Sequence, residues 1–279
     1  MRYFLLIAVL LATKLNAQSD LKFDKRFVQS EDKWVAFKAD KDSAYAYGFI
    51  YIDAQAGLTL NYEGTFKILS TGEFVPKKLD STNMKVRLQP NNVLVAFIPD
   101  NKFQELEISA VPEWLKYYKT DTSSVERLYR WGYMYNGWGE CAKALTYLER
   151  VEIVDPKYKG LAVELAYSYN CLERYDEAEA ILKEEIKNSS IDAYVNKEYI
   201  YTLTKNKKID EATRQFETSS KTLKDKRHNA ENCYNILQYY YQQKDKANFS
   251  KWYDILQSQP NENKLITRYA DNMKEDIDK

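Results

Sequence analysis

Hydrophobic positions recur at two different spacings along the chain, and the spacing changes near residue 125. Between residues 20 and 108, apolar and aromatic residues gather in short runs. In GLTLNYEGTFKI (57–68) they alternate with polar residues, as in a strand with one buried face. The runs MKVRL and VLVAFIPD lie on either side of QPNN and predict a hairpin. Roughly six to eight short strands predict a small all-β domain, sandwich or barrel-like, over residues 20–110.

Residues 111–124 separate the two patterns. Pro112 predicts the start of a short helix that carries Trp114 and Leu115, because proline is favoured in the first turn of a helix. The segment TDTSS that follows (120–124) predicts a loop and then a helix cap. From residue 125 onward the apolar positions follow the helical spacing of 3.6 residues. A linker helix and loop therefore precede an all-α region over residues 125–279.

Within the helical region, residues of similar type return every 34 positions. One column consists of Ala144, Ala178 and Ala212. Three more columns at the same period are Trp131, Leu165, Tyr199; Tyr135, Tyr169, Leu203; and Leu148, Leu182, Phe216. Small residues let two antiparallel helices approach closely, and large residues fill the space to the next pair. The four columns indicate a repeated packing unit.

This pattern resembles the tetratricopeptide repeat (TPR), a 34-residue helix-turn-helix unit with the consensus Trp-x2-Leu-Gly-x2-Tyr, Ala-x3-Phe and Pro. The first repeat matches it as Leu128-x2-Trp131-Gly132-x2-Tyr135, then Ala144-x3-Leu148 and Pro156. The second repeat loses the proline, the third is weaker, and a fourth over about 230–260 is out of phase by about three residues. LITRYADNMKEDI (265–277) predicts a capping helix.

The resemblance implies an all-α solenoid of three to four helical hairpins, so the whole chain is expected to be an α+β multidomain protein. The β half resembles N-terminal domains of exported repeat proteins from Bacteroidetes-like bacteria, although no motif defines that similarity.

The resemblance also implies a concave groove that binds a protein or peptide partner. The family's groove positions give Tyr133, Tyr167 and Tyr201 in one column, and Asn136, Asn170 and Thr204 in another. The predicted partner-binding residues are Tyr129, Tyr133, Asn136, Tyr167, Asn170, Tyr194, Lys197 and Tyr201. Rings and amides of this kind suit hydrogen bonding and stacking. In the alternative interpretation, the tyrosines only fill the inner curve or dock the β domain.

Three cysteines are present, and the repeat frame brings two of them together. Cys141 begins the second helix of repeat one, and Cys171 ends the first helix of repeat two. Neighbouring helices pack antiparallel, so a Cys141–Cys171 disulfide is expected, with a stabilisation of roughly 3–4 kcal/mol. Two separate buried thiols are the alternative, and Cys233 is expected to be a buried, unpaired thiol.

The first residues predict an exported protein. Arg2, an apolar run over residues 4–12 and the small residue Ala17 are typical of a signal peptide over residues 1–17, and an uncleaved anchor is the alternative. No membrane span is expected in the mature chain. Periplasm or cell envelope is the expected location, with secretion as the other outcome. The formal net charge of zero disfavours nucleic acid as a partner, because that affinity needs a concentrated basic surface.

No catalytic residue, cofactor or metal site is predicted. His228 is the single histidine, and neither GxxxxGK[ST] nor GxGxxG is present. Two alternatives to a non-enzymatic scaffold stay open. A carbohydrate-associated envelope protein would need an exposed aromatic platform formed by Trp34, Tyr45, Tyr47 and Tyr51. An enzyme would need at least two carboxylates converging in a pocket of the β domain.

Overall fold

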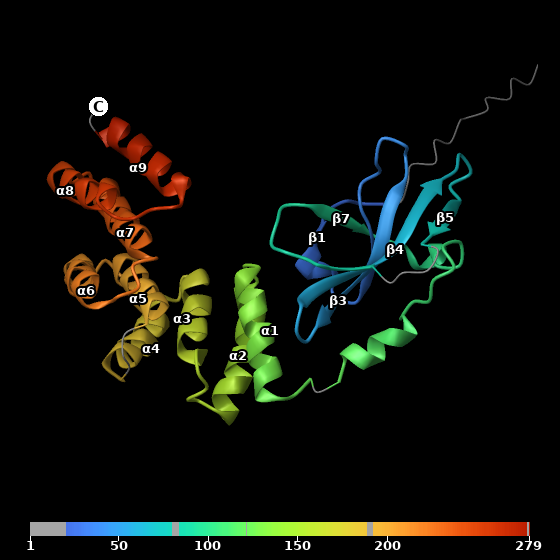
Figure 1. Cartoon of the computed structure of the whole chain (residues 1–279), viewed down its shortest axis with the longest axis horizontal. Coiled ribbons are helices and arrows are strands. Elements are labelled where there is room, and N and C mark those ends of the chain that lie inside the picture. The colour runs from blue at the N-terminus through green and yellow to red at the C-terminus, as the bar shows by residue number, and fades with distance from the viewer. Residues whose placement is uncertain (1–20, 80–83, 121, 189–191, 278) are drawn as a thin grey trace, which may run out of the picture. The chain divides into compact units, whose positions relative to one another are not determined.

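The computed structural model describes residues 21–79, 84–120, 122–188, 192–277 and 279. It divides into two compact units, residues 1–120 and residues 121–279 (Figure 1). The first unit contains strands and short 3-10 helices, and the second contains α-helices. The expected α+β class is therefore confirmed. The predicted signal peptide, residues 1–17, lies outside the described residues.

The N-terminal unit is built on one antiparallel sheet with the strand order β1-β7-β2-β3-β4-β5, in which β6 also pairs with β4. Its strands are β1 (Lys25–Arg26), β2 (Lys33–Ala36), β3 (Tyr45–Asp53), β4 (Gly57–Ile68), β5 (Phe74–Lys78), β6 (Met84–Arg87) and β7 (Leu94–Phe97). The 3-10 helices are η1 (Phe27–Ser30), η2 (Asp100–Lys102) and η3 (Glu113–Tyr118). β4 is long enough to carry β6 and β5 one after the other along the same edge.

The predicted hairpin over residues 84–100 is wrong. β6 pairs with β4, with Val86 opposite Leu60, whereas β7 pairs with β1 and β2. QPNN therefore connects two separate places in the sheet. The alternation predicted for β4 also covers only part of that strand, because Thr59 and Asn61 on the opposite face are buried as well.

The aromatic residues of the sheet form its core rather than an exposed platform. Trp34 is buried, and Tyr47 and Tyr51 have no exposed surface. The Trp34 indole donates a hydrogen bond to the Ser109 carbonyl at 2.8 Å. In η3, Trp114 packs edge-on against Tyr51, with ring centroids 5.0 Å apart. The platform required by the carbohydrate interpretation is therefore absent, and the predicted linker helix helps to cover the sheet.

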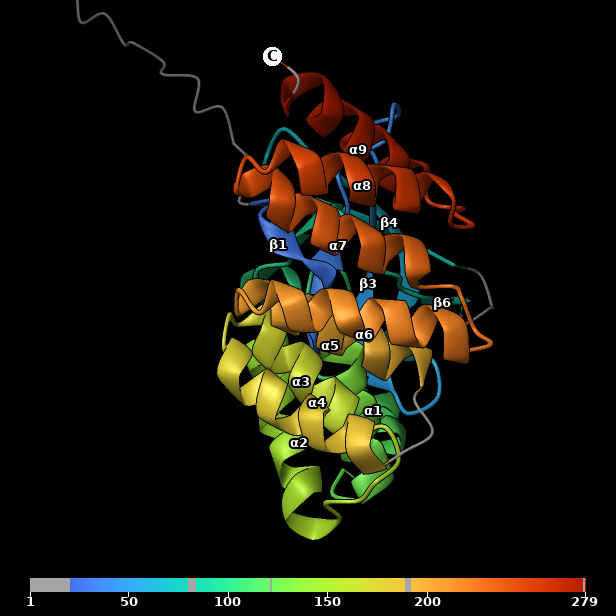
Figure 2. The same cartoon turned by 90° about the vertical axis from the view of Figure 1, so that its left-hand side faces the viewer.

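The described residues of the C-terminal unit form four TPR-like helical pairs and a ninth helix, stacked from α2 at one end to α9 at the other (Figure 2). Its helices are α1 (Val125–Gly137), α2 (Cys141–Val154), α3 (Leu161–Cys171), α4 (Tyr175–Asn188), α5 (Ala193–Lys205), α6 (Ile209–Thr222), α7 (Asn229–Gln242), α8 (Lys246–Gln257) and α9 (Lys264–Ile277). Ser124 caps α1 by accepting a hydrogen bond from the Arg127 backbone, as TDTSS predicts.

The helix starts confirm the period and its interruption. The second helices of the first three pairs begin at Cys141, Tyr175 and Ile209, each 34 residues after the last, whereas α8 begins 37 residues further on at Lys246. The three additional residues match the phase change predicted for the fourth repeat. α9 then packs against α7 and α8, as expected of a cap.

The small-residue columns allow close helix packing. Ala144, Ala178 and Ala212 have no exposed surface. At Gly132 in α1, an added Cβ would lie 2.4 Å from Leu148 Cγ in α2, which is closer than two carbon atoms can approach. Glycine is therefore required there by the distance between the two helices.

A disulfide joins the first two helical pairs. Cys141 begins α2 and Cys171 ends α3, and their bonded sulfurs link Cα atoms 6.2 Å apart. Cys233 is buried with an unpaired thiol, and burial raises the pKa of that thiol. Within the described residues, no helix is both long and apolar enough to cross a bilayer.

Candidate functional site

A cavity of about 1100 Å³ opens on the face formed by α1, α3, α5 and the residues just before α7, which we call the groove face. Its lining extends from Tyr129 of α1, in the first helical pair, to His228, which directly precedes α7 of the fourth pair. The lining residues are Tyr129, Tyr133, Pro156, Lys157, Tyr158, Lys159, Gly160, Ala162, Val163, Glu164, Glu185, Asp192, Tyr194, Val195, Arg227 and His228. The first helices of three pairs thus line a shared hollow, together with the loop before α3, Glu185 of α4 and the residues before α7.

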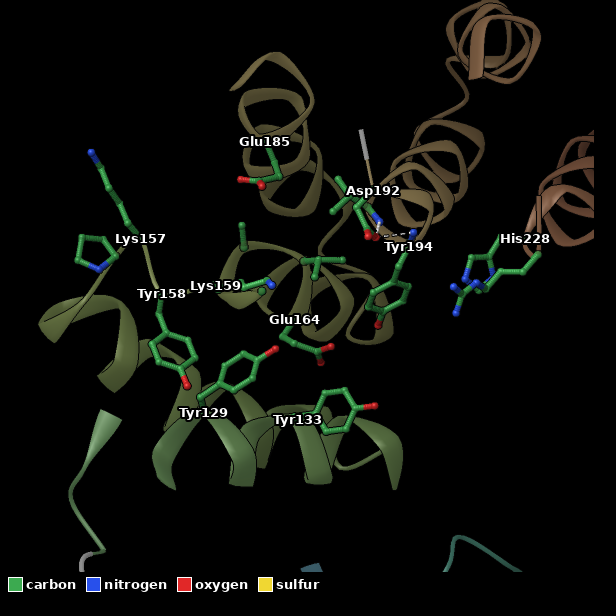
Figure 3. A pocket seen from close by; sticks show the side chains of 16 residues that line it. Tyr129, Tyr133, Lys157, Tyr158, Lys159, Glu164, Glu185, Asp192, Tyr194 and His228 are labelled. Atoms are coloured by element: carbon green, nitrogen blue, oxygen red, sulfur yellow. Dashed lines mark hydrogen bonds between the residues drawn. The ribbon is translucent and has the colours of Figure 1, made fainter. Parts of the chain in front are cut away.

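Three of the predicted tyrosines line this cavity. Tyr129 and Tyr133 come from α1, and Tyr194 comes from the first turn of α5 (Figure 3). The Tyr133 side chain is the most accessible of them, with 59% of its surface exposed. Together they provide aromatic walls on two sides of the cavity.

Tyr167 and Tyr201 are not among the residues that line the cavity. Both are partly buried. The Tyr201 ring lies 6.5 Å from the Tyr175 ring, and Lys205 Nζ lies 5.2 Å from its centroid. The 34-residue column therefore places one of its three tyrosines, Tyr133, in the cavity.

The two asparagines predicted to face the groove are buried between helices. Asn136 and Asn170 are almost fully buried. Asn136 Nδ2 donates to Glu164 Oε2 at 2.9 Å and Asn136 Oδ1 accepts from Ser168 Oγ at 2.7 Å. Groove exposure of these two residues was therefore a wrong prediction: their hydrogen bonds fasten each helical pair to the next.

The same polar network returns one repeat later. Asn170 Nδ2 donates to Glu198 Oε2 at 3.0 Å, and Thr202 Oγ1 donates to Asn170 Oδ1 at 2.9 Å. The acidic members, Glu164 and Glu198, were missed in the sequence although they lie 34 residues apart. In the next repeat the acid is replaced by Asn232, whose buried Oδ1 has no hydrogen-bond partner.

Lys197 is held inside the groove face rather than presented to solvent. Its Nζ lies 3.0 Å from Glu198 Oε1 and 3.5 Å from Glu231 Oε1. Burial alone would lower the pKa of Lys197, but the two carboxylates outweigh burial and raise it. Lys197 is therefore a cation already neutralised by its own chain.

Glu164 is the buried acid of the cavity. Only 2% of its surface is exposed, and its side chain points into the cavity toward the space between Tyr129, Tyr133 and Tyr194 (Figure 3). Burial raises the pKa of Glu164 to about 7, with a further rise from Glu198. Hydrogen bonds from Asn136 and Tyr194 and the positive charge of Lys197 offset part of the effect. This carboxylate changes charge near neutral pH.

Ring contacts fix the cavity walls. Tyr129 packs against Tyr158, with centroids 4.8 Å apart, and Tyr194 lies 6.3 Å from the His228 ring. Burial also raises the pKa of Tyr129, to about 12, so its hydroxyl stays protonated. Gly160, with φ of 86°, lets the Tyr129 hydroxyl approach its backbone, because a Cβ there would lie 2.5 Å from that oxygen.

A metal site and a carboxylate-based active site are the two other kinds of site to consider. Among the described residues, no cluster of three His, Cys, Asp or Glu could hold a metal ion. In the N-terminal unit, a cavity of about 440 Å³ is lined by Val111, Pro112, Glu113, Leu115, Lys116 and Lys119. It offers a single carboxylate, Glu113, where the enzyme interpretation needs two.

No protein-family model matches the chain, and no curated protein matches it significantly. Among solved structures, a tetratricopeptide repeat protein from Parabacteroides merdae is 15% identical over 62% of this chain, with a TM-score of 0.44. The match spans 62% of that protein, less than two thirds of its length. Two structures of nearly identical TPR-like repeats from Podosopora anserina, one a variant, are each 15% identical over 52% of this chain. They are covered to 79% and 80%, with TM-scores of 0.40 and 0.39.

Proposed function

We propose that the protein is a non-enzymatic exported scaffold, and that its helical unit holds a segment of a protein partner on the groove face. The single observation that carries the proposal is the cavity shared by α1, α3, α5 and the residues before α7. Its volume of about 1100 Å³ exceeds that of most small-molecule pockets and suits a peptide segment. Accessible tyrosine rings supply contact area at little cost in side-chain entropy.

Export to the periplasm or cell envelope, or secretion, is part of the same proposal. The sequence of residues 1–17 supports it, and a disulfide between Cys141 and Cys171 is suited to an oxidising compartment. Amino-terminal sequencing of protein isolated from its native cells tests this part. A mature chain that begins at Gln18 is expected, and a chain recovered from the reducing cytosol with residues 1–17 intact would contradict it.

Peptide selection tests the binding role. A library of random peptides displayed on phage would be selected against the full chain, and the selected peptides measured against Tyr133→Ala. Tyr133 is well exposed, so its replacement leaves the fold intact. We expect the affinity of selected peptides to fall about tenfold, the loss typical of an interface residue that contributes strongly to binding.

Tyr269→Ala provides the matched control, because Tyr269 is an exposed tyrosine of α9 that is not among the residues lining the cavity. It should leave the affinity unchanged. Selected peptides that bind wild type and Tyr133→Ala equally, or a library that yields no binder, would refute peptide binding at the groove face.

A further inference from the structure

Glu164 and Glu198 occupy the same place in successive repeats, yet only Glu198 forms a direct ion pair with a cation. The Lys197 ammonium lies 3.0 Å from the Glu198 carboxylate and 5.1 Å from the centroid of the Tyr194 ring. No described residue forms an ion pair with Glu164, whose hydrogen-bond partners Asn136 and Tyr194 are neutral. The charge of Lys197 lowers the pKa of Glu164 from a longer distance and offsets only part of the effect of burial. Successive repeats thus hold the same buried acid once with a direct ion pair and once without.

The surroundings of Glu164 and Glu198 differ at two positions of the repeat. The residue 34 positions before Lys197 is Val163, and the residue 34 positions before Tyr194 is Gly160. Both Val163 and Gly160 line the cavity. The hollow in front of Glu164 therefore opens where the second repeat lacks the lysine and the tyrosine that the third repeat supplies.

The other charged side chains around the cavity pair with a group of their own chain or lie exposed to solvent. Arg227 is paired with Asp225 at 2.6 Å, and His228 Nδ1 lies 3.6 Å from Glu231. Asp192 caps α5 through the backbone amides of Tyr194 and Val195. The other charged or titratable groups facing Glu164 or lining the cavity are Tyr129, Tyr133, Tyr158, Lys157, Lys159, Tyr167, Glu185, Tyr194, Lys197 and Glu198. Lys157 and Lys159 are exposed, so water and salt screen their charges from the buried carboxylate.

We propose that this cavity binds the ε-ammonium group of a lysine side chain in the partner, which pairs with Glu164 as Lys197 pairs with Glu198. The proposal rests on the proposed function and names the chemistry of the segment bound there. A buried carboxylate without a counter-ion is costly, and a cation that enters removes this cost. The tyrosine rings add an attraction for a cation that reaches their faces.

The protonation of Glu164 predicts how such binding depends on pH. Its pKa of about 7 means that the carboxylate is half protonated near neutrality in the unbound protein. Lysine binding requires the ionised carboxylate, so the affinity should rise as the pH increases through 7 and then level off. The ligand amine stays charged throughout this range, because the ordinary pKa of lysine is about 10.4.

Three matched probes test the proposal on the full chain. They are acetylated and amidated pentapeptides with two glycines on each side of a central lysine, Nε-acetyllysine or norleucine, titrated by NMR. We expect the lysine peptide to bind at least about tenfold more tightly than the other two, the gain expected from a charge-assisted hydrogen bond. Glu164→Gln should abolish this preference and its pH dependence.

A second variant places a lysine beside Glu164, at the repeat position that Lys197 occupies beside Glu198. Val163→Lys introduces a lysine at the position of Lys197, and its ammonium should fill the site, lower the pKa of Glu164 and prevent the lysine peptide from binding. Val163→Met fills similar space without a charge, so the pKa of Glu164 should stay raised. The titration of the Glu164 carboxyl carbon by ¹³C NMR distinguishes the two variants.

Equal affinity of wild type for the lysine and acetyllysine peptides would overturn the proposal, as would a Glu164→Gln variant that keeps the preference. Tri-N-acetylchitotriose binding that depends on Glu164, without a lysine preference, would assign the cavity to a sugar and also overturn it. If selected peptides still require Tyr133 after any of these outcomes, peptide binding at the groove face is supported. Only the recognition of a lysine by Glu164 is then refuted.

Discussion

At the scale of single residues, the helical unit uses buried polar side chains to join its repeats. Asn136 bonds across to Glu164, and Asn170 bonds across to Glu198, so each contact links the first helix of one pair to the first helix of the next. Hydrogen bonds of this kind specify the register between helices because they form in only one alignment. The same carboxylates also determine the electrostatics of the groove face.

The raised pKa of Glu164 predicts a pH-dependent stability. The folded protein holds this proton up to about pH 7, whereas the unfolded chain releases it near the ordinary value of 4.5. The resulting stabilisation is complete below pH 4.5 and is lost as the pH rises to 7. It amounts to about 3 kcal/mol in the free energy of unfolding.

Urea denaturation followed by helical circular dichroism measures this effect in wild type and in Glu164→Gln. Glutamine keeps the size of the side chain and does not titrate. The difference in unfolding free energy between the two proteins should shift in favour of Glu164→Gln as the pH rises from 4.5 to 7. A difference that stays constant over this range would show that Glu164 is not protonated in the folded protein.

The sequence located the groove tyrosines better than the groove amides. The groove positions implied by the repeat resemblance included Tyr129, Tyr133 and Tyr194, which line the cavity, and Tyr167 and Tyr201, which do not. Asn136 could not be placed correctly in the same way, because its partner Glu164 lies 28 residues further along the chain. Whether a polar side chain faces solvent or a buried partner depends on the neighbouring helix, which periodicity does not describe.

At the scale of elements, the distance between paired helices depends on small residues. Gly132→Ala in α1 would place a Cβ against Leu148 of α2, and we expect the free energy of unfolding to fall by about 1–3 kcal/mol through overpacking. Thermal or urea unfolding monitored by helical circular dichroism provides the measurement.

Gly137→Ala is the control for this prediction. Gly137 ends the same helix, and an added Cβ there meets nothing within 4 Å. This variant should be as stable as wild type or slightly more so, because alanine favours helix. Equal stability of Gly132→Ala and wild type would mean that α1 and α2 are not packed as closely as the structure shows.

Elements with an internal repeat were predicted well, and elements defined by distant pairing were not. The columns at 34 residues identified the helical pairs, including the change of phase before α8. The hairpin over residues 84–100 was wrong because β6 pairs with β4, a strand some twenty residues earlier, rather than with the run that follows QPNN. Local turn signals do not determine which sheet edge a strand joins.

At the scale of the whole molecule, each unit has a hydrophobic cluster of its own. The cluster in the first unit contains mainly residues of the sheet and η3, and a cluster in the second unit contains residues of α3 to α9. The division into a β half and a helical half could be predicted, because the apolar period changes at residue 125. The role of the aromatic residues in the β half could not, since exposed and buried tyrosines share the same strand sequence pattern.

The groove face is proposed to bind a segment of another protein. Photo-cross-linking in native cells tests it most directly, with benzoylphenylalanine placed either at Tyr133 in the cavity or at Ile153, an exposed position of α2 that is not among the cavity-lining residues. We expect one discrete cross-linked protein at position 133 and none at position 153, with a lysine in the cross-linked peptide. Equal labelling at both positions, or none at position 133, would contradict it.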